Sequence, residues 1–146
     1  MLQGSTFGIA LLLKYSSKVN LFKRQALLTK GHLINALEIT DDHRWVAMGL
    51  GDGSAEIYLY EEGLRLDQSI KPNNYSVCSL SLTHDHQYLA IGYEEGNEVP
   101  IYYYTNDSFS PFQILYFGSS TRRRVQLSHD HQHLLVAHRD GLVELY

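Results

Sequence analysis

The stretch Thr40-Asp41-Asp42-His43-Arg44-Trp45-Val46-Ala47-Met48-Gly49 decides the fold, because closely similar segments follow it twice along the chain. It returns as Thr83-His84-Asp85-His86-Gln87-Tyr88-Leu89-Ala90-Ile91-Gly92 and then as Ser128-His129-Asp130-His131-Gln132-His133-Leu134-Leu135-Val136-Ala137. Thr83 lies 43 residues after Thr40, and Ser128 lies 45 residues after Thr83. A nearly constant period of this length indicates a repeat architecture, in which each copy is one supersecondary unit stacked on its neighbours.

Each repeat contains four strand signals. The first strand alternates apolar and polar residues, as expected of a half-buried strand (Leu37–Ile39, Leu80–Leu82, Val125–Leu127). The second is a nearly continuous apolar run, which indicates burial on both faces (45–48, 88–91, 133–137). An acidic residue and Gly then predict a tight turn into the third strand (56–60, 101–104, 143–146). The fourth strand is expected at 64–70 and 112–117. The repeats are therefore interpreted as four-stranded antiparallel blades of an all-β propeller.

The ends of the units are expected to vary. Residues 7–13, 18–22 and 26–28 fit the last three strands of a preceding unit, and loops are expected at 71–74 and 105–111. Pro100 cannot donate a ladder hydrogen bond, which predicts a late start or a bulge in the third strand of the second copy.

Composition limits the class of protein. The 146 residues suffice for one domain with a core, and the 11 Tyr residues favour strands. A net charge of −4 argues against a nucleic-acid partner. The single Cys allows no internal disulfide, and the apolar run 7–13 is too short to span a bilayer. No membrane association is expected, and the cytoplasm is the expected location.

The chain resembles the WD40-repeat β-propellers, with a WD40 or YVTN type of blade, over almost its whole length. The resemblance rests on Gly31-His32, the turns containing Gly, the aromatic ends of the third strands and the period of the repeat. It implies a structural contact between His32 and Asp52 in one blade. The sequence departs from the family because no third strand ends in Trp-Asp and only one copy keeps Gly-His.

The resemblance divides the chain, residues 1–146, into about three and a half blades of a partial propeller. Residues 1–30 are the end of a preceding blade, 31–74 and 75–118 are two blades, and 119–146 are an incomplete blade. Closed propellers typically need four to eight blades. The chain is therefore expected to be a fragment of a longer propeller, with self-association into a ring and a small closed or irregular form as the alternatives.

Histidines in the repeated turns raise the question of a metal site. His84 and His86 flank Asp85, while His129, His131 and His133 surround Asp130. Imidazole and carboxylate groups bind divalent metals. The turns of successive blades are expected to lie too far apart for one ion to bind residues of two blades, so these turns are interpreted as solvated hairpin turns and no metal ligand is predicted.

Three successive arginines, Arg122, Arg123 and Arg124, begin the first strand of the last copy. Guanidinium groups pair well with carboxylates and phosphates, so these residues are the candidate contacts for a protein or peptide partner. The connections around His32 and Asn73-Asn74 are expected on the same face. Ordinary solvated strand residues are the alternative interpretation.

The function expected from the resemblance is a non-catalytic scaffold for protein–protein interaction. The sequence contains no nucleophile elbow, phosphate-binding loop or His-Glu-x-x-His motif, so no catalytic residue and no cofactor are predicted. The alternative is a piece of a propeller enzyme, of a hydrolase or lactonase type, whose active site lies in other blades.

Overall fold

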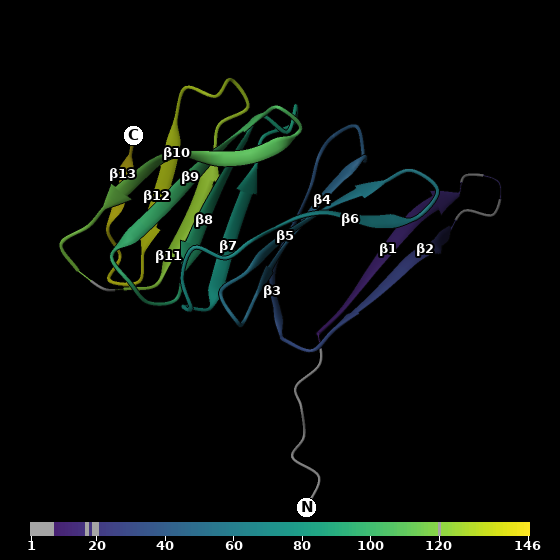
Figure 1. Cartoon of the computed structure of the whole chain (residues 1–146), viewed down its shortest axis with the longest axis horizontal. Coiled ribbons are helices and arrows are strands. Elements are labelled where there is room, and N and C mark those ends of the chain that lie inside the picture. Colours follow the sequence, from purple (N-terminus) through teal and green to yellow (C-terminus); the bar gives the residue numbers. More distant parts are fainter. Residues whose placement is uncertain (1–7, 17, 19–20, 120) are drawn as a thin grey trace, which may run out of the picture.

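All regular secondary structure in the described part of this computed structural model is β-strand (Figure 1). The structure describes residues 8–16, 18, 21–119 and 121–146. Within them, there is no helix long and apolar enough to cross a membrane. The predicted all-β fold is confirmed.

The chain begins with a long hairpin rather than with three strands. β1 (Gly8–Ser16) pairs antiparallel with β2 (Leu21–Lys30). The prediction of two separate strands at 18–22 and 26–28 is wrong, because a single strand, β2, extends from residue 21 to residue 30. Leu12 pairs with Ala26 and Leu13 with Arg24, so Gln25 is an extra residue absorbed as a bulge. Residues 1–7, 17, 19 and 20 lie outside the described part.

Three antiparallel sheets follow, and in each the strand order equals the chain order. The first contains β3 (Ile34–Ile39), β4 (Trp45–Leu50), β5 (Ala55–Tyr60) and β6 (Leu64–Ile70). The second contains β7 (Val77–Leu82), β8 (Tyr88–Tyr93), β9 (Glu98–Thr105) and β10 (Ser108–Tyr116). The third has three strands, β11 (Arg123–Leu127), β12 (Leu134–His138) and β13 (Val143–Leu145).

The second sheet differs from its prediction in its outer hairpin. A loop was expected over 105–111, but β9 and β10 are joined by a tight turn at Asn106 and Asp107. Both residues have positive φ, 51° and 60°, a conformation that Asn and Asp tolerate better than most residues. The ladder between β8 and β9 ends at Ile101, directly after Pro100, which has no N–H to donate.

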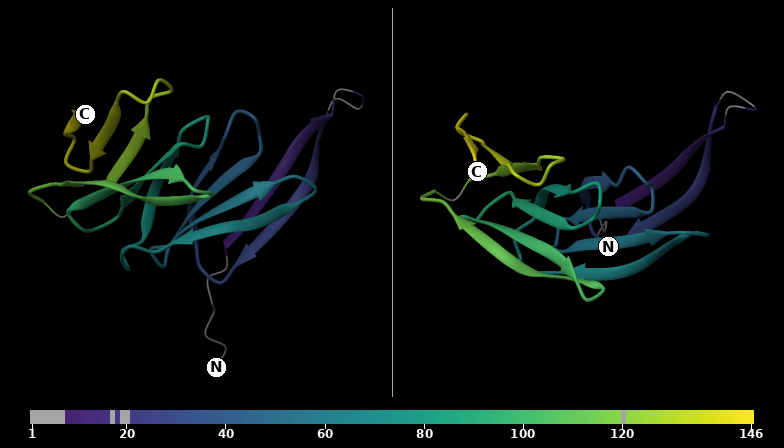
Figure 2. Two further views of the ribbon diagram at one scale, coloured as in Figure 1. Left: turned by 45° about the horizontal axis from the view of Figure 1, so that its top comes forward. Right: turned by 90° about the horizontal axis from the view of Figure 1, so that it is seen from above.

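The sheets stack face to face, and their first strands β3, β7 and β11 contact one another in series. Figure 2 shows the sheets side by side along an arc, each turned relative to the one before. The main core lies between the first two sheets, where Trp45, Ile57, Val77 and Leu89 are buried. A second core joins Ala90 and Val99 of the second sheet to residues of the third. Sheet stacking therefore buries the continuous apolar runs of β4 and β8, whereas Leu135 in the third run, on β12, is exposed.

Polar contacts also cross between sheets. The Gln68 side chain of β6 donates to the Phe109 carbonyl at 2.8 Å and accepts from the Phe109 N–H at 2.6 Å. The Asn73 amide donates to Glu98 Oε1 at 2.9 Å. The fourth strand of the first sheet is thereby bonded to the outer strands of the second.

Because the strands alternate in direction, each sheet places its turns at two opposite ends, which we call rims. The Arg122 rim comprises the segments 31–33, 51–54, 71–76, 94–97 and 139–142 together with Arg122. The His84 rim comprises the turns 40–44, 61–63, 83–87, 106–107 and 128–133. The rims hold the sequence-derived candidate residues apart from one another, because His32, Asp52 and Arg122 lie on one rim and the histidine-rich turns on the other.

Candidate functional site

His32 and Asp52, the pair implied by the family resemblance, lie on the Arg122 rim. His32 Nε2 is 3.8 Å from Asp52 Oδ2, which is longer than a hydrogen bond. Asp52 instead accepts hydrogen bonds from the Ser54 N–H at 3.1 Å and the Ser54 hydroxyl at 2.6 Å, with Lys71 Nζ at 3.4 Å. Partial burial alone would raise the pKa of the Asp52 carboxyl, but Ser54 and Lys71 lower it. Sequence reasoning missed both of these partners.

The three successive arginines do not share one environment. Arg123 is only 1% exposed, and its guanidinium donates to the carbonyls of Gly96 at 2.6 Å and Thr121 at 3.0 Å, and also to that of Ser119. Its guanidinium carbon also lies 4.5 Å from the centre of the Phe117 ring. The hydrogen bonds of Arg123 are therefore made within the protein, where they join β11 to the turns of the second sheet.

Arg122 and Arg124 are exposed on either side of Arg123. Arg122 lies 3.4 Å from Glu94, and its carbonyl accepts a hydrogen bond from the Arg139 N–H at 3.1 Å. A hollow on this rim is lined by Glu94, Glu95, Thr121, Arg122 and Arg139. The role of the arginines in partner binding stays a prediction, and only the outer two present their side chains to solvent. Arg139, beside Arg122, was not singled out from the sequence.

The first and third repeated turns of the His84 rim have the same internal hydrogen bonds. The second turn differs in one of them, because the Thr83 hydroxyl donates to the Tyr88 carbonyl at 3.4 Å instead of to Asp85. In the first turn, Thr40 Oγ1 donates to Asp42 Oδ1 at 2.5 Å and accepts from the Trp45 N–H at 3.1 Å. The Arg44 N–H also donates to Asp42 Oδ1, at 2.9 Å. Burial alone would raise the pKa of the Asp42 carboxyl, but the bonds from Thr40 and Arg44 lower it. The third turn repeats this arrangement with Ser128 and Asp130.

A histidine occupies the left-handed position of each turn. His43, His86 and His131 have φ values of 59°, 53° and 61°. The His86 ring stacks on Trp45 of the preceding sheet with a centroid distance of 4.8 Å, and the His131 ring lies 5.7 Å from Tyr88 in the same relation. The repeated turn thus also packs each sheet against the one before it.

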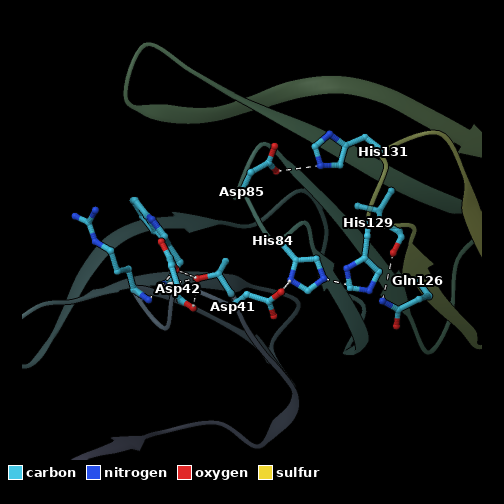
Figure 3. A network of polar contacts seen from close by, with 11 residues as sticks. Asp41, Asp42, His84, Asp85, Gln126, His129 and His131 are labelled. Atoms are coloured by element: carbon cyan, nitrogen blue, oxygen red, sulfur yellow. Dashed lines mark hydrogen bonds and ion pairs between the residues drawn. The ribbon is translucent and has the colours of Figure 1, made fainter.

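Asp41, His84 and His129 are the residues that directly follow Thr40, Thr83 and Ser128 in the three turns. Their side chains lie close together on this rim and form a cluster (Figure 3). Asp41 Oδ2 lies 2.6 Å from His84 Nδ1, and His84 Nε2 lies 3.2 Å from His129 Nε2. The two rings are stacked, with centroids 3.7 Å apart and an interplanar angle of 15°. The expectation that successive turns lie too far apart is wrong, because the first strands of the three sheets stand next to one another.

Two further groups border this cluster. His131 Nε2 lies 3.1 Å from Asp85 Oδ1, which forms a second contact between the turns of the second and third sheets (Figure 3). Burial raises the pKa of the Glu38 carboxyl on β3, against the opposing effect of nearby His84. Each pair of neighbouring sheets is therefore joined at this rim by a carboxylate and an imidazole, Asp41 with His84 and Asp85 with His131.

Comparison with protein-family models and with curated proteins finds no match. Solved structures do match. A chain in the crystal structure of the mitotic checkpoint complex superposes with a TM-score of 0.72 at 15% sequence identity, over 93% of this chain and 41% of that chain. The β-propeller domain of Cps50 (Swd1) from Myceliophteria thermophila gives 0.69 at 12% identity, over 90% of this chain and 45% of that one.

These likenesses show the fold, which is that of a partial WD40-like β-propeller. The chain spans less than half the length of either solved chain. The resemblance stated from the residues is thereby confirmed at the level of the fold.

Proposed function

We propose that this chain is part of a non-catalytic scaffold for protein–protein interaction of the WD40 type. Stacked sheets with buried cores hold two rims of short turns in fixed positions, and such rims suit the presentation of side chains to a partner. The likeness to a chain of the mitotic checkpoint complex, which is an assembly of proteins, supports this proposal.

The Arg122 rim is the proposed contact surface, and an acidic peptide segment is the proposed partner chemistry. The observation that carries this assignment is the placement of Arg122 and Arg139 side by side at an exposed edge, above the buried Arg123. The Arg123 guanidinium fixes the start of β11 because it donates hydrogen bonds to backbone carbonyls of neighbouring segments. The exposed arginine next to it is therefore attached to an ordered stretch of backbone. His32 and the connection at Asn73-Asn74 belong to the same rim.

The test is binding of a fluorescent hexaglutamate peptide to the wild-type chain and to the double variant Arg122→Ala, Arg139→Ala, which removes both exposed arginines of this rim. Exposed charge pairs contribute about 0.2–1 kcal/mol each, so we expect the dissociation constant of the double variant to rise about 2- to 30-fold. Its dependence on salt concentration should also be flatter, because fewer charges are screened.

Arg44→Ala is the matched control, because Arg44 is an exposed arginine of the opposite rim with an ion pair to Glu61 at 3.4 Å. It should leave peptide affinity unchanged. Equal affinity and equal salt dependence in the wild type and the double variant would remove the Arg122 rim as the contact surface.

A further inference from the structure

Three potential metal ligands from three successive sheets converge at the centre of the His84 rim. They are Asp41, His84 and His129, which occupy the same position in the three repeated turns. One ligand atom of each lies within 4.8 Å of the other two. These residues are distinct from the proposed contact surface, which lies on the opposite rim.

The chemistry of the donors suits a borderline divalent cation. Two imidazole nitrogens and one carboxylate oxygen form a common three-residue ligand set for zinc, with water in the fourth position. With metal–nitrogen distances of about 2.0–2.1 Å, two ligands of a tetrahedral ion are about 3.3 Å apart. The Nε2 atoms of His84 and His129 are 3.2 Å apart, which is already the separation that such an ion requires.

The surroundings of His84 favour a cation through the charge next to it. Asp41 Oδ2 is 2.6 Å from His84 Nδ1, and His84 Nε2 is 3.2 Å from His129 Nε2. The contact between Asp41 and His84 Nδ1 is not a hydrogen bond, so Asp41 can leave this nitrogen to serve as a ligand of the ion. Glu38 adds a further negative charge beside His84.

To hold one ion, the three side chains require a modest adjustment. The two rings are nearly parallel, so each must turn to direct its lone pair at a shared ion. Room for this exists, since the side chain of His84 is 35% exposed and that of Asp41 is 76% exposed. Asp41 can move toward the ion without disturbing the buried core.

We propose that Asp41, His84 and His129 form a binding site for one divalent zinc ion that links the turns of three successive sheets. The direct contact between the two imidazole rings is then replaced by coordination of both rings to the same ion. The ion joins segments more than forty residues apart in the sequence, so it stabilises the folded arc by mass action.

The experiment is a calorimetric titration of zinc chloride into the full chain, prepared without a histidine tag and freed of metal with a chelator. We expect one ion per chain. The variants His84→Gln and His129→Gln should each weaken binding at least about tenfold, since loss even of an outer partner of a metal ligand costs about 10- to 100-fold. Cobalt added in place of zinc should give the intense visible absorption of a tetrahedral site.

His133→Gln is the matched control, because His133 belongs to the same turn as His129 but not to the cluster. It should retain the zinc affinity of the wild type. Asp41→Asn at the exposed turn provides a third ligand variant if either histidine variant does not fold, and it should also weaken binding. No saturable binding to the wild type, or equal affinity in the wild type and the ligand variants, would overturn the proposal.

Discussion

Thr40 shows how one hydroxyl fixes a turn. The residue is 1% exposed, and its Oγ1 both donates to Asp42 and accepts from the Trp45 N–H. In the second turn, Thr83 likewise accepts from the Tyr88 N–H at 2.9 Å, but its hydroxyl donates to the Tyr88 carbonyl at 3.4 Å. The hydroxyl thus satisfies an N–H that the strand ladder leaves unpaired.

We therefore expect Thr40→Val to lower the free energy of unfolding by about 1–3 kcal/mol, because a buried N–H loses its acceptor while the side-chain shape is kept. Urea denaturation followed by tryptophan fluorescence measures the change. Thr105→Val, at an exposed position, should change stability by less than about 0.5 kcal/mol. Equal midpoints for Thr40→Val and the wild type would contradict this role.

The sequence identified which residues form the candidate sites better than it predicted the burial of these residues and the distances between them. Alternation along β11 places Arg123 on the same face as the buried Val125, and this signal could have separated Arg123 from its neighbours. The equivalent positions of Asp41, His84 and His129 were visible in the repeat. Their mutual distance was not, because it depends on how closely the first strands of successive sheets approach one another.

At the level of elements, the closest approach between sheets occurs at glycines of the second strands. A Cβ atom on Gly92 of β8 would lie 2.4 Å from the Arg123 carbonyl oxygen of β11. That oxygen also accepts a hydrogen bond from the Cys78 thiol at 3.0 Å. The strand β8 can pack against β11 at this distance only without a side chain at residue 92.

Gly92→Ala should lower the free energy of unfolding by about 1–3 kcal/mol, because the added methyl group forces two backbone segments apart. Gly63→Ala is the control, since a Cβ there meets nothing within 4 Å. Thermal denaturation monitored by circular dichroism compares the two variants. A Gly92→Ala protein as stable as Gly63→Ala would show that the sheets adjust without cost.

The repeat pattern predicted the positions of most strands of the first two sheets well, because turn residues and apolar runs are local signals. It did not predict the buried face of β3, where Leu37 and Ile39 are exposed and Glu38 between them is half-buried. The prediction failed where the residue types suggested a loop or a break but the pairing between two strands continues. Residues 105–111 contain Asn, Asp and Pro and suggested a loop, but a two-residue turn at Asn106 and Asp107 lets β10 start at residue 108. In β2, the pairing with β1 continues past the bulge at Gln25, which the sequence suggested as a break.

At the scale of the whole molecule, the third sheet leaves an apolar face in contact with solvent. Leu135 and Leu145 are paired across strands and are 41% and 65% exposed, and Val143 beside them is 57% exposed. Exposed apolar faces of this kind favour association with another protein surface.

We expect the isolated chain to self-associate through this face as its concentration rises, which sedimentation equilibrium would detect as an increasing mass. The double variant Val143→Lys, Leu145→Lys should remain monomeric over the same range, because two charges cannot be buried there without partners. Replacement of Arg65 on β6 and of Lys71 in the connection after β6 by Ala serves as the control, because both side chains are exposed and far from the third sheet in sequence, and it should not alter the mass. A monomeric wild type at all concentrations would exclude association through the third sheet.

The carbonyl contacts of Arg123 have a consequence for synthesis of the chain on the ribosome. Arg123 belongs to the third sheet, but its guanidinium donates a hydrogen bond to the Gly96 carbonyl of the second sheet. In the same way, the Phe109 carbonyl of the second sheet accepts a hydrogen bond from the Gln68 side chain of the first. A nascent chain therefore cannot complete the bonding of one repeat until the following repeat has emerged. We therefore expect folding during synthesis to proceed from the amino end with a lag of one repeat, so that the most recently synthesised repeat is the one open to proteases and chaperones.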